Sequence, residues 1–127
     1  MKDTFEEMMV NNILYQAEQY LKELGAFYPF GCAIDKNNRI VPLSAYSEND
    51  NPPAQELIEV LEAGIIKNFK EGNYFIAGIA VDVLLKEADR SYDAIEIRIV
   101  EKGNEQYKKQ IKYTLKDGKV EFGNIQS

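Results

Sequence analysis

Residues 73–86, with the sequence NYFIAGIAVDVLLK, form the longest apolar stretch of the chain and decide its fold. Apolar side chains occupy both alternating faces over most of this length, which is typical of a strand that is covered on both sides. We therefore expect the central strand of a sheet here. Asp82 is the charged residue that interrupts the apolar run.

The segments that follow alternate between apolar and polar residues, as strands with one wet face do. Residues 93–101 place every second side chain, an isoleucine, on one face, and residues 107–116 repeat the alternation. Asp117–Gly118 is a hairpin turn signal, because both residue types accept a positive φ. It predicts a short last strand at 119–123, followed by a loose tail at 124–127.

Before the central stretch, residues 4–24 have apolar residues at three- and four-residue spacing, which is typical of an amphipathic helix. We expect Asp3 or Thr4 to cap this helix, because Glu6 and Glu7 follow at the spacing of a capping box. Gly25 is expected to end it.

The next two segments, 26–35 and 39–46, are predicted strands joined by a turn at residues 36–38. Pro29 lacks an amide donor, so it is expected at a strand start, a bulge or an edge of the sheet. Pro42 makes the second strand a candidate for an edge as well.

The most polar stretch of the chain, residues 47–55, is a predicted loop. It leads into a second amphipathic helix that continues to about Lys70. Asp50 or Asn51 is expected to cap this helix, and Gly72 is expected to end it.

These elements follow the order α-β-β-α-β-β-β, with a further short strand at the end. Because all strand connections except the helical one are short, neighbouring strands are expected to be antiparallel. We predict an α+β fold in a single domain over residues 1–127, with two helices packed against an antiparallel sheet of five or six strands.

The composition excludes several classes of function. One cysteine and no histidine leave no basis for a disulfide framework, a Ser-His triad or a structural zinc site. The net charge of −6 disfavours a nucleic-acid partner. No apolar run spans a membrane, no signal peptide is recognised and no phosphate-binding motif occurs, so we expect a cytoplasmic protein without a cofactor or membrane partner. The basic cluster is interpreted as the solvent face of a strand and its hairpin: Lys108, Lys109, Lys112 and Lys116.

The order of elements resembles that of roadblock, longin and profilin-type domains, which have a leading helix, a β-hairpin, a crossing helix and a three-stranded meander. The segment GAFYPFGCAIDKNNRI at 25–40 resembles the glycine-bearing first hairpin of such domains, and also a segment of small uncharacterised bacterial proteins. The resemblance covers nearly the whole chain, although the chain ends on strands where roadblock domains have a third helix. It implies a non-catalytic scaffold that dimerises or docks partners.

Two residues inside predicted strands have chemistry that needs an explanation. Cys32 is either a buried structural thiol or, if the helix that starts near Pro52 packs close by, a thiolate with a lowered pKa. One interpretation of Asp82 is a carboxylate with a shifted pKa at a functional site. The alternatives are that it lies on a solvent-exposed strand end, or that it pairs with Arg98 or a lysine across the sheet. The other carboxylates of these strands are expected to be exposed: Asp35, Asp93 and Glu96.

Aromatic side chains, prolines and carboxylates concentrate around the first predicted hairpin and the loop after it, at residues 28–53. Core packing is expected to explain most of these aromatic rings. The alternative is a contact surface for proteins in which Tyr28, Tyr46 and Tyr92 line a groove, since tyrosine suits half-wet contacts. The expected binding residues are Tyr28, Phe30, Tyr46, Glu48, Asp50 and Asp82.

Two hypotheses for the function follow. The first is a small non-catalytic protein-binding or scaffold domain that binds a protein partner or a second copy of itself through the first hairpin. An acidic, immunity-type inhibitor of a basic protein is a special case of it. The second is a small-ligand sensor or an enzyme whose site combines Asp82, Cys32 and Tyr28, and it requires these side chains to meet in one cleft.

Overall fold

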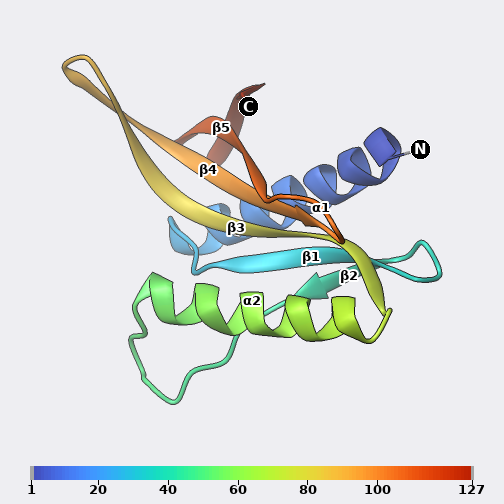
Figure 1. The fold of residues 1–127 in the computed structure, drawn as a ribbon. Coiled ribbons are helices and arrows are strands. Elements are labelled where there is room, and N and C mark those ends of the chain that lie inside the picture. The colour runs from blue at the N-terminus through green and yellow to red at the C-terminus, as the bar shows by residue number, and fades with distance from the viewer. Residues whose placement is uncertain (1, 127) are drawn as a thin grey trace.

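The computed structural model of the chain describes residues 2–126 and has the predicted α+β fold (Figure 1). Two helices and six strands follow the order α-β-β-α-β-β-β-β. Their bounds are α1 Lys2–Leu24, β1 Phe30–Asp35, β2 Ile40–Leu43, α2 Ala54–Lys70, β3 Tyr74–Glu87, β4 Arg90–Glu101, β5 Tyr107–Lys116 and β6 Lys119–Gln126.

The strands form one antiparallel sheet in the order β2-β1-β3-β4-β5-β6. From β3 onward each strand pairs with the next, whereas α2 crosses from β2 back to β3 and thereby places β1 between them. β2 is an edge strand, as Pro42 predicted. Pro29 directly precedes β1, in agreement with the strand-start alternative, and β1 lies inside the sheet and not at its edge.

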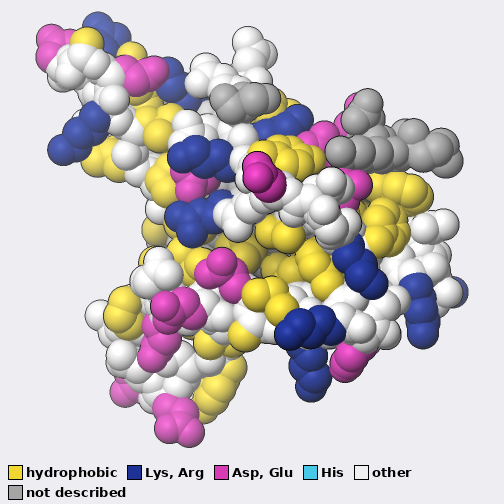
Figure 2. All heavy atoms as spheres, in the orientation of Figure 1, with side chains coloured by type: hydrophobic (Ala, Val, Ile, Leu, Met, Phe, Trp, Pro, Cys, Tyr) yellow, Lys and Arg dark blue, Asp and Glu magenta, His cyan; other side chains and the backbone are white. Residues whose placement is uncertain are grey.

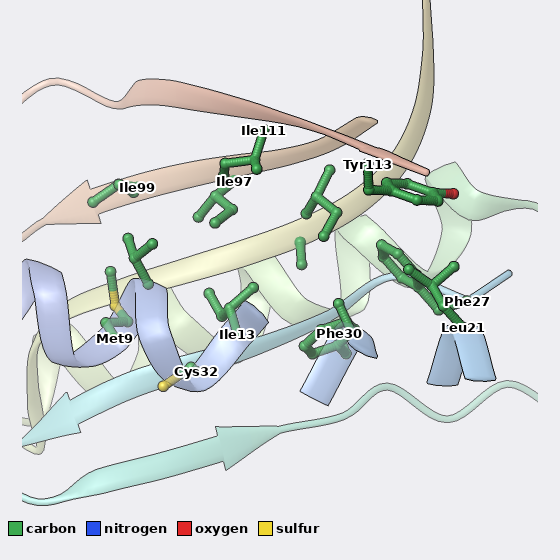
Figure 3. Packing of buried hydrophobic residues seen from close by; sticks show 14 of the residues in the cluster. Met9, Ile13, Leu21, Phe27, Phe30, Cys32, Ile97, Ile99, Ile111 and Tyr113 are labelled. Carbon is green, nitrogen blue, oxygen red and sulfur yellow. The ribbon is translucent and has the colours of Figure 1, made fainter. Parts of the chain in front are cut away.

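The two helices cover opposite faces of the sheet (Figure 1). Ile76 and Ala80 of β3 pack in the core under α1, and the residues that alternate with them pack in the core under α2. The prediction of a central strand covered on both sides is therefore confirmed. Figure 3 shows the core under α1, in which Met9 and Ile13 meet the isoleucines of β4 and β5. Burial of one such side chain contributes about 1.5–3 kcal/mol.

The hairpin of β3 and β4 is longer than predicted, because β4 begins at Arg90 instead of residue 93. Glu87 pairs with Arg90 across a two-residue turn, in which Ala88 has a φ of 55°. Alanine rarely adopts this conformation, so the sequence contains no turn signal at this point. Figure 1 shows the tip of this hairpin reaching beyond the rest of the sheet.

The last strand is also longer than predicted. Ile125 pairs with Ile111 and Gln126 with Gln110, beyond a register shift between Ile111 and Tyr113. A bulge of this kind inserts one residue and lets the pairing continue. The expected loose tail is therefore wrong for residues 124–126, and residue 127 lies outside the described part of the chain.

The first hairpin has shorter strands than predicted, since β1 begins at Phe30 and β2 ends at Leu43. Residues 26–29 run into β1 without strand pairing, and Pro29 among them has no N–H to donate. The segment from 44 to 53 also lies outside the sheet. These two irregular segments, one from each side of the hairpin, form the walls of the groove described below.

The predicted turns are confirmed by their backbone angles. Asn38 has a φ of 63° in the turn between β1 and β2, and Asp117–Gly118 has φ values of 53° and 73°. The carboxylate of Asp35 stabilises the first turn, because its Oδ1 accepts the N–H groups of Asn37 at 2.8 Å and Arg39 at 2.9 Å.

Both helices end at the predicted glycines, which have positive φ: 79° at Gly25 and 76° at Gly72. The starts of the helices differ from the prediction. α1 begins at Lys2, so Asp3 and Thr4 lie inside the helix and not before it.

The start of α2 has no side-chain cap. Pro53 is the N-cap residue, in extended conformation, and Asp50 and Asn51 lie too far upstream. The predicted caps are therefore wrong. The side-chain oxygen of Asn51 instead accepts the hydroxyl of Tyr28 at 3.2 Å, so it connects the two irregular segments.

Candidate functional site

An apolar groove lies at the end of α1, between the segment that leads into β1 and the segment that leads into α2. Its volume is about 360 Å³. The groove is lined by Tyr20, Leu24, Phe27, Tyr28, Pro29, Phe30, Ser44, Ala45, Tyr46, Ser47, Pro52 and Leu57. None of these side chains is charged, so the groove offers its occupant an apolar surface with hydroxyl groups at the rim.

Three of the six predicted binding residues line this groove. Phe30 is buried in its floor, where Tyr20 and Phe27 contact its ring edge-on at centroid distances of 5.2 and 5.4 Å. Tyr28 and Tyr46 stand at the rim with 54% and 80% of their surface exposed. The groove therefore has a floor of packed aromatic rings and a rim of two exposed tyrosines.

The remaining predicted binding residues do not line the groove. Glu48 and Asp50 are exposed on the loop beside it. Figure 2 shows acidic side chains gathered over the loop that leads into α2. Tyr92 borders a different hollow, at β5 and β6, so the prediction that it joins Tyr28 and Tyr46 is wrong.

A smaller hollow of about 90 Å³ continues from the groove along α2, and the two share Ser44. It lies between Leu43 at the end of β2 and the helix residues Val60 and Gly64. Val60 is an exposed apolar side chain, and the space beside Gly64 is open. Sequence analysis did not identify this extension, because it depends on how close α2 lies to the edge strand.

Asp82 lies on the face of the sheet that α1 covers, and the hydroxyl of Tyr113 donates to its Oδ1 at 2.7 Å. Burial raises the pKa of Asp82, as does the negative charge of Asp93, while hydrogen bonds from Tyr113 and the Phe27 backbone oppose the shift. The expected pairing of Asp82 with Arg98 or a lysine is wrong, because its partner is a tyrosine.

The three residues of the enzyme or sensor hypothesis lie apart. Cys32 is buried beneath Met9 and Ile13, whereas Tyr113, the partner of Asp82, lies at the other end of the same core beside Phe27 (Figure 3). The hydroxyl of Tyr28 donates to the loop before α2. The groove and the hollow beside it that Tyr28 lines include neither Asp82 nor Cys32.

Burial raises the pKa of the Cys32 thiol to about 12. We therefore expect native Cys32 to resist iodoacetamide at pH 8, where only about one thiol in ten thousand is ionised at such a pKa. In urea the thiol regains an ordinary pKa, and mass spectrometry should show alkylation at least ~100-fold faster than in the native protein. Similar rates in both states would contradict this prediction.

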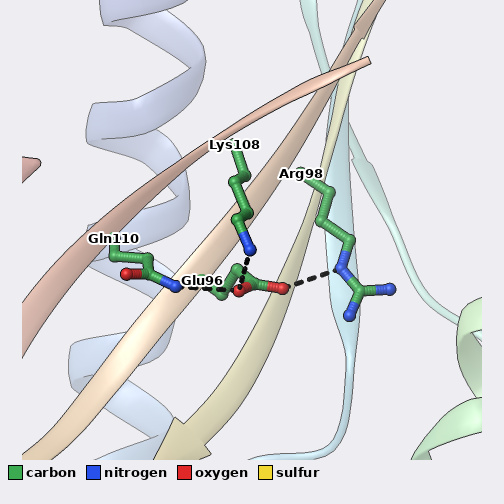
Figure 4. Close-up of polar contacts among 4 residues, drawn as sticks. All are labelled: Glu96, Arg98, Lys108 and Gln110. Carbon is green, nitrogen blue, oxygen red and sulfur yellow. Dashed lines mark hydrogen bonds and ion pairs between the residues drawn. The ribbon is translucent and has the colours of Figure 1, made fainter. Parts of the chain in front are cut away.

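The prediction that Glu96 is exposed is wrong. Its pattern predicts exposure, but only 7% of its surface is accessible. Figure 4 shows its carboxylate bound by three side chains: Arg98 Nε donates to Oε2 at 2.9 Å, Gln110 Nε2 donates to Oε1 at 3.0 Å, and Lys108 Nζ lies 3.6 Å from Oε1. Burial alone would raise the pKa of Glu96, but these hydrogen bonds and the two positive charges together lower it.

The remaining observations concern metals, membranes and related proteins. Within residues 2–126, no group of His, Cys, Asp or Glu side chains is arranged to hold a metal ion. Neither described helix has the length and apolar character of a membrane span. Comparisons with protein-family models, with curated proteins and with solved structures find no match for the chain.

Proposed function

We propose that this chain is a non-catalytic protein-binding domain, which binds an apolar side chain of a cytoplasmic partner in the groove at the first hairpin. The observation that supports the proposal is the exposure of Tyr28, Tyr46 and Leu24 around a cavity without charged residues. Exposed aromatic side chains around a preformed pocket are characteristic of the centre of protein interfaces.

The surroundings of the groove define the chemistry of the partner. Glu48, Asp50 and Glu56 are exposed beside it, and Ser47 at the rim donates to Glu56 Oε2 at 2.7 Å. A partner whose apolar anchor is flanked by lysine or arginine complements this rim. An inhibitor of a basic protein would have such a surface, and so would the docking scaffold implied by the resemblance to roadblock-type domains.

Side-chain contacts are favoured over addition of a strand to the sheet. The carbonyl of Arg39 accepts the N–H of Asp35, so Arg39 faces β1 with its backbone groups. Because this direction alternates along an antiparallel strand, the backbone N–H and C=O positions of Ile40, Pro42 and Ser44 face the free edge. Pro42 has no N–H, and a strand added there would lose a hydrogen bond at its centre.

An enzyme or sensor site at Asp82, Cys32 and Tyr28 receives less support. The thiol of Cys32 is buried and protonated, and the half-buried carboxylate of Asp82 accepts a hydrogen bond from Tyr113. Catalysis would require these groups to reach one substrate, and their separation in the fold counts against it.

The experiment is a selection of displayed random peptides on the wild-type protein, followed by calorimetric titration of the peptides that it enriches. We expect enriched peptides to contain an aromatic or aliphatic residue next to lysine or arginine. Tyr46→Ala should weaken their binding about tenfold or more, the loss typical of an interface hot spot. Tyr15 is also an exposed tyrosine, at 66%, but it lies on α1 away from the groove, and Tyr15→Ala should change binding less than about twofold.

Equal loss of binding in the two variants, or enrichment of acidic peptides, would count against the proposal. Sedimentation velocity adds an independent check. If the wild type is a dimer and Tyr46→Ala dissociates it, the groove binds a second copy of the chain. That result would contradict the proposal of a separate protein partner.

A further inference from the structure

The face of the sheet that carries Glu96 is only partly covered by a helix. α2 packs on the residues of β1 and β3 at this face, from Ala33 to Val81. The strands β4, β5 and β6 continue the sheet beyond α2, while α1 covers their other face (Figure 1). The side chains of β4 to β6 that point away from α1 therefore form an open surface, called here the open face.

The open face is basic although the chain as a whole has a net charge of −6. Residues paired across neighbouring strands point to the same side, so the register identifies the members of the face. The basic members are Arg90, Arg98, Lys108, Lys112, Lys116 and Lys119, and the acidic members are Glu87, Glu96 and Glu121. Figure 2 shows Lys and Arg side chains over the sheet above α2, apart from the acidic loop before α2.

Arg98 is held in a defined orientation at the margin of this face. Its Nε donates to the buried carboxylate of Glu96 at 2.9 Å, and Lys108 stands beside it across the strand pair. Figure 4 shows the two terminal guanidinium nitrogens directed away from Glu96. An arginine fixed through Nε keeps a planar pair of donors for a second acceptor, and this geometry matches a carboxylate.

Further along β5, a second cation is also held in place. Lys112 forms an ion pair with Glu87, and its ammonium lies 4.0 Å from the centre of the Tyr92 ring. Lys112 is therefore fixed between a carboxylate and an aromatic face. Arg98 and Lys112 point to the same side of the sheet, with Lys108 and Gln110 between them on β5.

We propose that the open face binds an acidic segment of a protein partner. The terminal nitrogens of Arg98 hold one carboxylate of that segment, and Lys108 and the other lysines of β5 and β6 hold the neighbouring carboxylates. This surface is separate from the apolar groove, which lies beside β1 and β2. Its charge is opposite to that of the groove's rim, so the two surfaces select different partners or different parts of one partner.

A protein segment fits the face better than a nucleic acid does. Glu121 and Glu87 interrupt the row of basic side chains, and the evenly spaced phosphates of a nucleic acid would meet them. The net negative charge of the chain also repels a long polyanion, whereas a short acidic peptide responds mainly to the local charges.

The test is a titration of fluorescein-labelled hexaglutamate with the protein at low ionic strength, followed by fluorescence anisotropy, with hexaglutamine as the neutral probe. We expect hexaglutamate alone to bind, with an affinity that falls as salt is added. Lys108 is 61% exposed, but its ammonium also lies 3.6 Å from Glu96 Oε1, so Lys108→Glu is first checked for folding by circular dichroism. The folded variant should weaken binding about fivefold. Lys36→Glu makes the same change of charge in the exposed turn between β1 and β2, and should change binding less than about twofold.

Arg98→Lys tests the fork geometry, because it keeps the positive charge and removes the paired donors. It should weaken hexaglutamate binding, and amide chemical shifts in the wild-type complex should move on β4 and β5 and not at the groove. Equal effects of Lys108→Glu and Lys36→Glu would overturn the proposal. Tighter binding of a single-stranded hexathymidylate than of hexaglutamate would assign the face to nucleic acid and overturn it as well.

Discussion

Gly31→Ala should lower the free energy of unfolding by about 3 kcal/mol, the upper range for overpacking a core. A Cβ atom added at Gly31 would lie 2.6 Å from the backbone oxygen of Gly78 on the neighbouring strand. Backbone cannot rotate out of the way as a side chain does, so β1 and β3 would have to separate at the centre of the sheet. Urea unfolding followed by circular dichroism measures the loss.

Gly64→Ala is the matched control. Gly64 lies within α2, and nothing is within 4 Å of the position of its added Cβ. Since glycine costs about 1 kcal/mol relative to alanine inside a helix, this variant should be more stable than the wild type. If both substitutions moved the urea midpoint in the same direction, the close approach of Gly31 to the backbone of β3 would not explain the effect of Gly31→Ala.

Glu96→Gln should lower the free energy of unfolding by about 2 kcal/mol at pH 7, the range for hydrogen bonds that involve charged groups. Glutamine keeps the shape of the side chain but removes the negative charge that pairs with both Arg98 and Lys108. Its NH2 group would also face one of the groups that now donate to the carboxylate of Glu96. The pKa of Glu96 is lowered in the folded protein. Its contribution to stability is therefore complete above the unfolded-state pKa and is lost as the pH falls through the folded pKa.

Asp82→Asn provides the comparison with the opposite sign. The pKa of Asp82 is raised in the folded protein, chiefly by burial, so its ionised form destabilises the fold once the pH rises above the unfolded pKa. Asparagine still accepts the hydrogen bond from Tyr113 without a charge. At pH 7 this variant should be at least as stable as the wild type, and Glu96→Gln less stable.

Urea unfolding from pH 3 to 8 distinguishes the two carboxylates. The difference between the wild type and Glu96→Gln should shrink as the pH falls below the unfolded-state pKa of Glu96, because the unfolded protein then binds a proton more readily than the folded protein does. A constant difference across this range would mean that packing and not charge explains the loss. A large loss for Asp82→Asn at pH 7 would show that its negative charge stabilises the fold.

Local patterns were sufficient to predict most of the architecture. The double-sided apolar run of β3, the alternation in β4 and β5, and the turn at Asp117–Gly118 each depend on residues close together in the chain. The predicted helices likewise follow from spacing and from the glycines that end them. Antiparallel pairing then follows from the short connections, so the order of elements needs no long-range information.

The errors concern features that depend on residues far apart in the sequence. Glu96 alternates with isoleucines as an exposed residue would, and its burial depends on the register that brings Gln110 and Lys108 beside it. The extension of β6 depends on a bulge opposite β5. α2 begins at Ala54 with Pro53 as its N-cap, and the predicted cap Asn51 instead accepts a hydrogen bond from Tyr28, which lies far from it in the sequence.

The candidate groove was predicted in part. The concentration of aromatic residues around the first hairpin identified Tyr28, Phe30 and Tyr46, which share one cavity. Glu48 and Asp50 lie near it, and Asp82 and Tyr92 lie elsewhere, because position along a strand does not tell which face a helix will cover. The contribution of Leu24 was not expected, because the apolar residues of the predicted helix at 4–24 should pack against the sheet, whereas Leu24 is exposed.

The place of β1 between β2 and β3 also affects how the chain folds while the ribosome makes it. β1 must wait for its second neighbour, and the apolar side of α1 must wait for Ile97 and Ile111, which are synthesised much later. At about 5–20 residues per second, translation from β1 to the end of β4 takes on the order of several seconds. During that interval the nascent first half has a helix and a hairpin but no sheet to bury them. The emergence of β3 and β4 therefore sets the earliest moment at which the sheet can form around β1.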